Sequence, residues 1–385
     1  MNKEKYNQNN ETLAIFLNEE RTETIPSKEE YVFDKAICTV NGNVTEEVKV
    51  VWDEEDWAPI LYNIKDHSTK CNLYFRNYHV LTIQNNNQTE KIKVPTNTQN
   101  YRYEKSIDDT ILSCNSEAKL TMDNNTITIS NITKDIFCTR YESSKEAISH
   151  LDSTANYWLY LKDEINIETL IVPENYFLTI DLNGKTRTGP LSNYGNLELT
   201  STAQAGILNV NTNDDEVFQT YQNSKTLIDN VKIIAPYSTI HSYDNSYVEI
   251  NSSTILSEGM GGVDSALWMH GGNTVLNVNN SVVTGPFSIG GEGGEITVTD
   301  STITGTSQNG ININDGFTGN IKVVGNTKVT AAIDGIVIRE GSVTIQNTEF
   351  SPNVKGESRA VVLYESNSIF NFYGGDLYGK NDIYL

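Results

Sequence analysis

The sequence has little positive charge: 28 lysines and arginines face 50 aspartates and glutamates, for a net charge of −22. Phosphate binding needs a basic face, so this deficit excludes nucleic acid as a partner and disfavours an anionic membrane surface. No window reaches the roughly 20 apolar residues of a membrane span, so we expect no membrane insertion. With 37% hydrophobic and 20% charged residues, the chain should fold as a soluble protein.

Targeting signals are also missing. The opening stretch, MNKEKYNQNNETLAIFLN, has no apolar run of signal-peptide length and no small-residue cleavage site. We therefore expect no Sec signal in this chain. Two interpretations stay open: export by another route, such as cytoplasmic assembly followed by lysis, or prior removal of a leader.

Helix-forming composition is sparse as well. There are only 4 methionines, and no window is rich in alanine or in glutamate and lysine. Tyrosine, threonine, valine, isoleucine, asparagine and glycine are abundant, which favours β-strands and turns. The composition therefore predicts an all-β protein.

The first 141 residues contain an internal duplication. Residues 13–77 and 80–141 share the same order of features, which is a short strand, a proline, an aromatic strand, an early cysteine and a late cysteine. Each copy is a set of short strands broken by Asn, Gly, Asp and Pro turns. We predict a disordered segment at 1–10, then two small β-sandwich modules at 11–78 and 79–142.

The four cysteines recur once early and once late in each copy. This recurrence predicts the pairs Cys38–Cys71 and Cys114–Cys138, each stapling a domain too small for a large core. The alternative is two free, buried cysteines per module. Two bridges would indicate an oxidising environment. No CxxC pair occurs, so we expect no zinc site of ordinary spacing.

The modules resemble small repeated modules of surface and prophage proteins of Gram-positive bacteria. The stretches YVFDKAIC, VVWDEEDWAPILYNI and TKCNLYF carry this resemblance, over residues 11–141. The second copy has no counterpart of Trp52 or Trp57. We expect both tryptophans to belong to the core, because a tryptophan in an alternating strand is usually buried.

From residue 143 onward the pattern is repetitive. VEINSSTI at 248, LNVNNSVV at 276, ITVTDSTI at 296, VTIQNTEF at 343 and FNFYGGDL at 370 share apolar first, third and eighth positions. The eighth positions recur every 20 to 28 residues once two looser copies are included, and we call them anchors: Ile233, Ile255, Val283, Ile303, Val329, Phe350 and Leu377.

A second apolar stripe lies between the anchors, at Ile240, Leu267, Met269, Ile289, Ile311, Ile313, Ile336, Ile338, Val361 and Leu363. Two in-phase stripes per repeat predict a parallel β-helix over 143–385, with asparagines in the turns bonding neighbouring coils. A capping-box signature at Ser143–Glu146 predicts a short capping helix ahead of it, running to Leu151.

The phrase LTIDLNG, Leu178 to Gly184, resembles the first coils of right-handed parallel β-helices of the pectin-lyase-like type. This resemblance covers about residues 155–385, and bacterial and phage surface proteins share the phrase. It implies the fold but not one activity, because β-helices serve as lyases, hydrolases, spikes and stalks.

A polar column follows the second stripe, at His270, Glu292, Asp315, Arg339 with Glu340, and Glu365. If successive coils stack about 4.8 Å apart, these side chains form a ladder. Asp315, Arg339 and Glu340 are candidate catalytic residues, and Glu292 and Asp315 are candidate ligands for Ca²⁺. No other cofactor is expected. The simpler alternative is a solvated row of turns.

Three residues are candidate ligand-binding groups: Trp268, His270 and Tyr364. Alternation along the strand points Trp268 outward, beside His270 and several glycines, where an indole can stack on a sugar ring. Packing against a loop or another copy of the chain is the alternative.

We therefore expect a non-enzymatic fibre or adhesin-type protein, on the virion or outside the cell, that presents a β-helix to a host-surface glycan or receptor. Without a leader, a phage or prophage tail fibre or spike is favoured over a bacterial surface adhesin. Proteins that the chain resembles assemble as homotrimers. The rival hypothesis is a polysaccharide lyase or glycoside hydrolase acting on the β-helix face.

Overall fold

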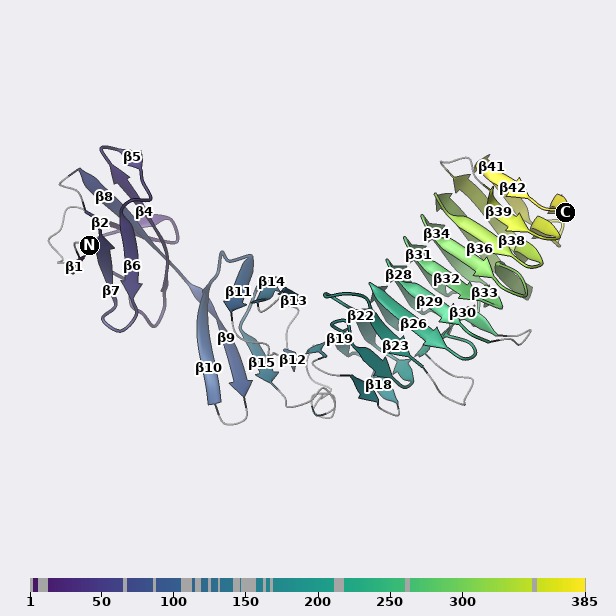
Figure 1. Ribbon diagram of the computed structural model, residues 1–385, viewed down its shortest axis with the longest axis horizontal. Helices are drawn as coiled ribbons and strands as arrows, with labels where there is room; N and C mark the ends of the chain where they lie inside the picture. The colour runs from purple at the N-terminus through teal and green to yellow at the C-terminus, as the bar shows by residue number, and fades with distance from the viewer. Residues whose placement is uncertain are drawn as a thin grey trace. The chain divides into compact units, whose positions relative to one another are not determined.

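The computed structural model describes residues 3–5, 13–64, 68–85, 88–104, 113–114, 119–123, 126–130, 132–140, 146, 157–161, 164–166, 169–210, 218–259, 264–347 and 352–384. Every secondary-structure element in these ranges is a β-strand, which confirms the all-β prediction (Figure 1). Contacts divide the chain into two compact units. The first comprises Met1–Lys105, Glu117–Leu120 and Thr126–Cys138, and the second Ser106–Ser116, Thr121–Asn125 and Thr139–Leu385. The module boundaries at 78 and 142 stay a prediction.

The first module is a small sandwich of two sheets. One sheet has the order β1 (Lys3–Lys5), β7 (Ala58–Tyr62), β6 (Lys49–Asp53). The other has the order β3 (Glu20–Thr22), β2 (Leu13–Leu17), β8 (Thr69–Arg76), β4 (Val32–Val40), β5 (Asn43–Val44). Strand β1 lies within the segment expected to be disordered, and pairs Lys3 with Tyr62 because β7 offers it an open edge.

The core of this module joins the two sheets. Leu61 of β7 packs with Cys38 and Cys71 of the facing sheet. Trp52 stacks on Phe33 with ring centroids 5.1 Å apart, and the Nε1–H of Trp57 donates to the carbonyl of Pro26 at 2.7 Å. Both tryptophans are half-buried against the core, as the alternation predicted.

The predicted disulfides are present. Cys38 and Cys71 face each other across β4 and β8, with Cα atoms 4.0 Å apart, and are bonded. Cys114 and Cys138 are also disulfide-bonded, and no cysteine is free, so the second pair is the one that the duplication predicted.

The second module is described as short strands. A hairpin pairs β9 (Tyr78–Asn85) with β10 (Gln88–Pro95), and a three-stranded sheet has the order β11 (Asn100–Glu104), β14 (Thr126–Ser130), β13 (Lys119–Asp123). Two further strands are β12 (Ser113–Cys114) and β15 (Ile136–Arg140).

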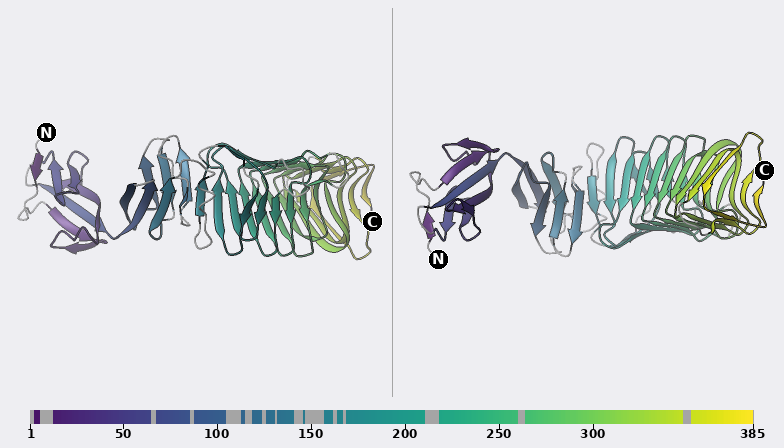
Figure 2. Two further views of the ribbon diagram at one scale, coloured as in Figure 1. Left: turned by 90° about the horizontal axis from the view of Figure 1, so that it is seen from below. Right: turned by 90° about the horizontal axis from the view of Figure 1, so that it is seen from above.

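Residues 170–378 form a parallel β-solenoid of the right-handed type, in which strands of successive coils lie side by side (Figure 2). Each coil contributes one strand to each of three sheets. Sheet 1 contains β17 (Ile165–Asn166), β20 (Thr186–Thr188), β23 (Gly206–Asn209), β26 (Val231–Ala235), β29 (Thr254–Ser257), β32 (Val282–Gly285), β35 (Thr302–Gly305), β37 (Lys328–Ala331), β39 (Pro352–Gly356) and β42 (Asp376–Tyr378).

Sheet 2 contains β18 (Leu170–Val172), β21 (Leu191–Asn193), β24 (Phe218–Thr220), β27 (Ile240–Ser242), β30 (Ser265–Met269), β33 (Phe287–Gly291), β40 (Arg359–Leu363) and β43 (Asn381–Tyr384). Sheet 3 contains β16 (Tyr157–Tyr160), β19 (Phe177–Asp181), β22 (Asn196–Thr200), β25 (Lys225–Asp229), β28 (Tyr247–Asn251), β31 (Val275–Asn279), β34 (Gly294–Thr299) and β41 (Ile369–Gly374). Two long strands, β36 (Ile311–Gly325) and β38 (Asp334–Asn347), take part in both.

The anchors stack in register through sheet 1. Ile233, Ile255, Val283, Ile303 and Val329 pair in succession on neighbouring strands and are buried. Val329 then pairs with Val354, and Val354 with Leu377. The anchor of that coil is therefore Val354, where the sequence phrase favoured Phe350, a residue outside the described ranges. The insertion between strands shifts the true anchor by four residues.

The second stripe stacks in register through sheet 2. Ile240, Leu267, Ile289, Ile311, Ile336 and Val361 pair from coil to coil, and all are buried. Sheet 3 adds a third stripe, and together the three fill one continuous core. Of the predicted capping helix, the structure describes Glu146 alone, and the rest of residues 143–151 lies outside the described ranges, so the helix stays a prediction.

The LTIDLNG phrase builds a turn. The buried carboxylate of Asp181 accepts hydrogen bonds from the N–H of Asn183 at 2.9 Å and from the N–H and hydroxyl of Thr202 at 3.0 and 2.6 Å. Burial raises the pKa of this carboxyl, and its hydrogen bonds oppose that shift. Asn183 and Gly184 follow with φ of 49° and 70°, a left-handed conformation that asparagine and glycine adopt at low cost.

Candidate functional site

A column of aromatic side chains stands where the chain turns from sheet 2 to sheet 3. We call Tyr194, Tyr221, Tyr243 and His270 the aromatic column. Each is the first residue after its strand, and each backbone N–H donates to a carbonyl of the preceding coil: Tyr194 to Val172, Tyr221 to Asn193, Tyr243 to Thr220 and His270 to Ser242, at 2.6–2.8 Å. The register of the solenoid therefore fixes the column.

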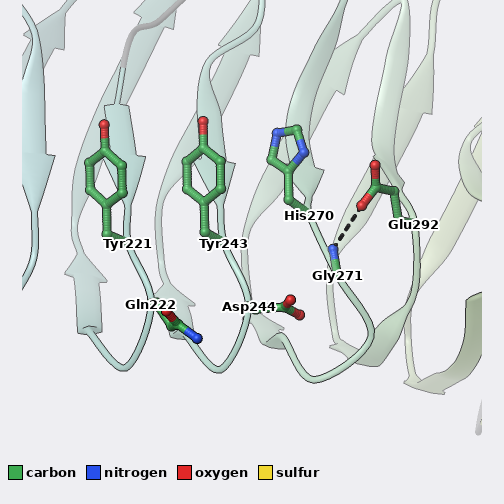
Figure 3. Close-up of a pocket in the computed structure, with 7 residues that line it drawn as sticks. All are labelled: Tyr221, Gln222, Tyr243, Asp244, His270, Gly271 and Glu292. Atoms are coloured by element: carbon green, nitrogen blue, oxygen red, sulfur yellow. Dashed lines mark hydrogen bonds between the residues drawn. The ribbon is translucent and has the colours of Figure 1, made fainter.

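The four rings are stacked along the solenoid axis. Ring centroids lie 4.0 Å apart between Tyr194 and Tyr221, 5.1 Å between Tyr221 and Tyr243, and 4.6 Å between Tyr243 and His270, with planes within 8° of parallel. Figure 3 shows the last three rings in this row. These separations match the spacing of about 4.8 Å between coils. The ring faces therefore cover one another, and the edges remain for a ligand.

The turns that follow Tyr221, Tyr243 and His270 each contain a residue with positive φ. Asn223 and Asn245 have φ of 63° and 59°, and Gly271 has φ of 85°. Asparagine and glycine adopt this left-handed conformation at low cost. The repeated pattern of tyrosine, one variable residue and asparagine thus places Gln222 and Asp244 at equivalent positions beside the column.

A groove of about 430 Å³ runs along these turns over four coils. Its lining residues are Tyr221, Gln222, Tyr243, Asp244, His270, Gly271 and Glu292 (Figure 3). The Glu292 Oε2 atom accepts the N–H of Gly271 at 3.0 Å. A Cβ atom placed on Gly271 would lie 1.7 Å from Oδ1 of Asp244, so this glycine is what allows the Asp244 carboxylate to approach. Two carboxylates therefore converge on Gly271 from the coils before and after it.

Two histidines meet at the column's end. His270 Nε2 lies 3.2 Å from His241 Nδ1, a hydrogen bond in which one ring donates and the other accepts. The stacking of His270 on Tyr243 adds a second constraint. The His270 ring is therefore held in place before any ligand arrives.

The groove has the chemistry of a polar binding site. Hydroxyl, imidazole, amide and carboxylate groups line a surface held by the parallel sheets, and such groups recognise hydroxylated ligands through hydrogen bonds.

The structure brings only some of the predicted residues to this groove. His270 and Glu292 line it. Trp268 is half-buried on the neighbouring outer face of sheet 2, where its ring covers Gly290 and lies 6.3 Å from that of His270, centroid to centroid.

Tyr364 and Arg339 lie farther along the same edge. The Arg339 guanidinium carbon sits 4.2 Å from the Tyr364 ring centroid, so this arginine is engaged in a cation–π contact. Glu340 accepts a hydrogen bond from the Asn367 amide at 3.3 Å. The Asp315 side chain is outside the described residues, so the catalytic and Ca²⁺ hypotheses that include it stay predictions. Within the described part of the chain, no three histidine, cysteine, aspartate or glutamate residues form a group that could hold a metal ion.

Sequence reasoning missed Tyr221, Gln222, Tyr243 and Asp244. The signal was present, because Tyr194, Tyr221, Tyr243 and His270 each lie three positions after an inward apolar residue of sheet 2, which is Leu191, Phe218, Ile240 and Leu267 in turn. The predicted polar column was defined by titratable side chains in the turns, and it therefore began at His270. Stacking of aromatic rings from coil to coil was the missing criterion.

In the ranges that the structure covers, there is no helix long and apolar enough to cross a membrane. No protein-family model, curated protein or solved structure gives a significant match to the chain.

Proposed function

We propose that this chain is a non-enzymatic fibre or adhesin-type protein whose solenoid holds a glycan in the groove beside the aromatic column. One observation carries the proposal: a preformed groove lined by hydrogen-bonding groups that repeat on four successive coils. The coil spacing of about 4.8 Å is close to the length of one sugar residue in a chain. A glycan lying along the axis therefore meets at least one polar side chain from each successive coil.

The energetics favour this use of the groove. The three sheets fix the backbone of the lining residues, and stacking fixes the rings, so the groove loses less conformational entropy on association than a flexible loop would. Aromatic edges supply apolar contact, and Gln222, Asp244 and Glu292 offer donors and acceptors for sugar hydroxyls.

The wider setting is part of the same proposal. The LTIDLNG phrase supports a relationship to pectin-lyase-like solenoids of surface and tail-fibre proteins, with a phage or prophage tail fibre or spike favoured over a bacterial adhesin. The two disulfides support a final location outside the cytoplasm. A homotrimer is the assembly that this setting implies. Light scattering on the purified chain tests it, and a monomer at micromolar concentration contradicts it.

The binding test uses the full chain on an array of bacterial surface glycans, followed by titration calorimetry on each hit. The variant Gln222→Ala with Asp244→Ala removes two exposed groove side chains. We expect at least a tenfold weaker affinity, because about 1.4 kcal/mol of binding energy corresponds to a factor of ten. Glu365→Ala with Ser366→Ala is the matched control, since both residues are exposed in a turn on the same edge but outside the groove.

Three outcomes contradict the proposal. If no glycan on the array binds, the proposed ligand class is wrong. If the groove and control variants lose the same affinity, the groove is not the binding site. Release of unsaturated products or new reducing ends from a bound polysaccharide, abolished by Arg339→Ala, establishes the rival lyase or hydrolase hypothesis.

A further inference from the structure

We propose that the groove selects a glycan carrying free ammonium groups, that is, a polymer containing unacetylated amino sugars, and rejects polyuronates. This inference rests on the proposed glycan binding and adds the substrate class. It starts from the charge of the groove and not from its shape.

The two carboxylates of the groove are placed together. Asp244 and Glu292 come from the coils on either side of His270 and Gly271, and both approach Gly271. Only glycine permits this approach, because any Cβ at position 271 would collide with the Asp244 carboxylate. The floor of the groove thus carries two negative charges separated by one residue's backbone.

Protein groups leave these charges largely uncompensated. No lysine or arginine is among the described residues that line the groove. Within the described ranges Asp244 makes no hydrogen bond or ion pair, and Glu292 uses one oxygen, Oε2, for the Gly271 N–H. The Oε1 atom of Glu292 and both oxygens of Asp244 therefore remain for donors from a ligand. The net charge of −22 adds a long-range attraction for cations.

The stacked rings decide where an ammonium group can go. A cation binds over an aromatic face, and here each face between Tyr194 and His270 is covered by its neighbour. Ring edges carry partial positive charge and do not attract a cation. The carboxylates are consequently the cation-binding groups, and the ring edges contact the uncharged parts of the sugar.

The same geometry opposes an acidic sugar. A uronate carboxylate in this groove would face Asp244 and Glu292, with no lysine or arginine among the described lining residues, and like charges at short range repel. The charge of this groove is therefore opposite to that of a groove that binds a polyuronate.

The experiment compares three hexasaccharides of matched length: hexameric glucosamine, its fully N-acetylated form, and hexagalacturonate. Affinities for the full chain are measured by calorimetry at pH 6 and 150 mM salt, where the amines are charged and long-range attraction is screened. We expect glucosamine hexamer to bind at least tenfold more tightly than the acetylated form, and hexagalacturonate to bind most weakly.

The test variant is Asp244→Asn with Glu292→Gln, which keeps the size of both side chains and an acceptor for the Gly271 N–H. It should lose at least tenfold in affinity for hexameric glucosamine and clearly less for the acetylated form, because the amides still hydrogen-bond to sugar hydroxyls but no longer attract an ammonium group. The control is Glu365→Gln, which removes an exposed charge from the same edge outside the groove and should change neither affinity.

The possible failures are distinct. If none of the three hexasaccharides binds and the array is also blank, the proposed glycan binding is wrong. If glycans bind but the acetylated or uronate hexamer binds as tightly as glucosamine, the inference on substrate class is overturned. An ammonium preference that survives in the amide variant, or that the Glu365→Gln control also loses, overturns it as well, because the attraction then comes from overall charge.

Discussion

Arg187 occupies an apolar column of the solenoid core. It pairs with Ile165 on one side and Leu208 on the other, in line with the anchor Ile233, and its side chain is fully buried. Its guanidinium donates to the carbonyls of Gly189 at 2.7 Å and Pro190 at 2.9 Å. Burial lowers the pKa of Arg187 to about 10. The folded state therefore carries a charge that water would hold more favourably.

This arginine leads to a stability prediction. The lowered pKa corresponds to a cost of about 3 kcal/mol for the charged form in the folded state. Replacement by methionine removes that cost but leaves the Gly189 carbonyl without its donor, a loss of about 1–3 kcal/mol. The Pro190 carbonyl keeps a partner, because it still accepts the N–H of Leu170. We therefore expect the free energy of unfolding of Arg187→Met, measured with urea, to equal that of the wild type or to exceed it by up to about 2 kcal/mol.

The sign of the pH dependence follows from the same shift. Between about pH 10 and the ordinary pKa of arginine, the unfolded chain holds a proton that the folded chain has released, so the wild type gains stability as pH rises. Any excess in the free energy of unfolding of Arg187→Met over the wild type should therefore become smaller above pH 10. Leu208→Ala is the control and should cost about 2–5 kcal/mol. A loss above 2 kcal/mol for Arg187→Met would mean that the guanidinium stabilises the core.

At the scale of the element, the turn between sheets 3 and 1 repeats a hydroxyl ladder. The N–H of Ser253 donates to the Ser281 hydroxyl at 3.0 Å, and that of Ser281 to the Ser301 hydroxyl at 3.0 Å. The residues before them, Ser252 and Asn280, have φ of 48° and 47°. The side-chain amide of Asn279 donates to Oδ1 of Asn251 on the neighbouring coil, as predicted for asparagine. The buried N–H groups of Ser253 and Ser281, however, find their acceptors in serine hydroxyls.

Removing one hydroxyl from this ladder tests how much the ladder contributes to the free energy of unfolding. Ser281→Ala leaves the buried N–H of Ser253 without an acceptor, so we expect a loss of about 1–3 kcal/mol in the free energy of unfolding. Thr284→Ala, on the half-buried outer position of β32, should change it by no more than about 0.5 kcal/mol. Equal effects of the two substitutions in urea unfolding would show that water replaces the hydroxyl.

At the scale of the whole molecule, the first module and the solenoid each have described buried clusters of their own. The disulfide Cys38–Cys71 closes a separation of 33 residues in the first module, whose described buried clusters are small. The solenoid core is one continuous cluster without a disulfide. The chain's net charge of −22 opposes edge-to-edge association between copies through like-charge repulsion.

Removing that disulfide should destabilise the first module and not the solenoid. We expect Cys38→Ala with Cys71→Ala to cost the first module about 2–4 kcal/mol, because the unfolded chain gains conformational freedom. Calorimetry should show the unfolding transition of the first module at a lower temperature and that of the solenoid at an unchanged temperature. Val44→Ala, 73% exposed in the same sheet, is the control and should shift neither transition. A solenoid transition that moves with the first would contradict the independence of the two cores.

The sequence alone determined the solenoid, because each coil must bury its own apolar residues and stacking repeats them at a fixed phase. Ile255, Val283 and Ile303 were assigned to one column from spacing, and they pair in register. It also determined the cysteine pairs, since a duplication repeats its covalent links. Where an insertion altered the phase, at Val354, the spacing failed.

Only the tertiary structure decided the site. A groove depends on which turn side chains approach one another across coils, and that depends on details such as the missing Cβ of Gly271, which admits the Asp244 carboxylate. The aromatic column likewise exists only because parallel register brings Tyr221 and Tyr243 within stacking distance. Sequence periodicity specifies which residues face inward, whereas the outer surface is free to vary and takes its chemistry from three-dimensional proximity.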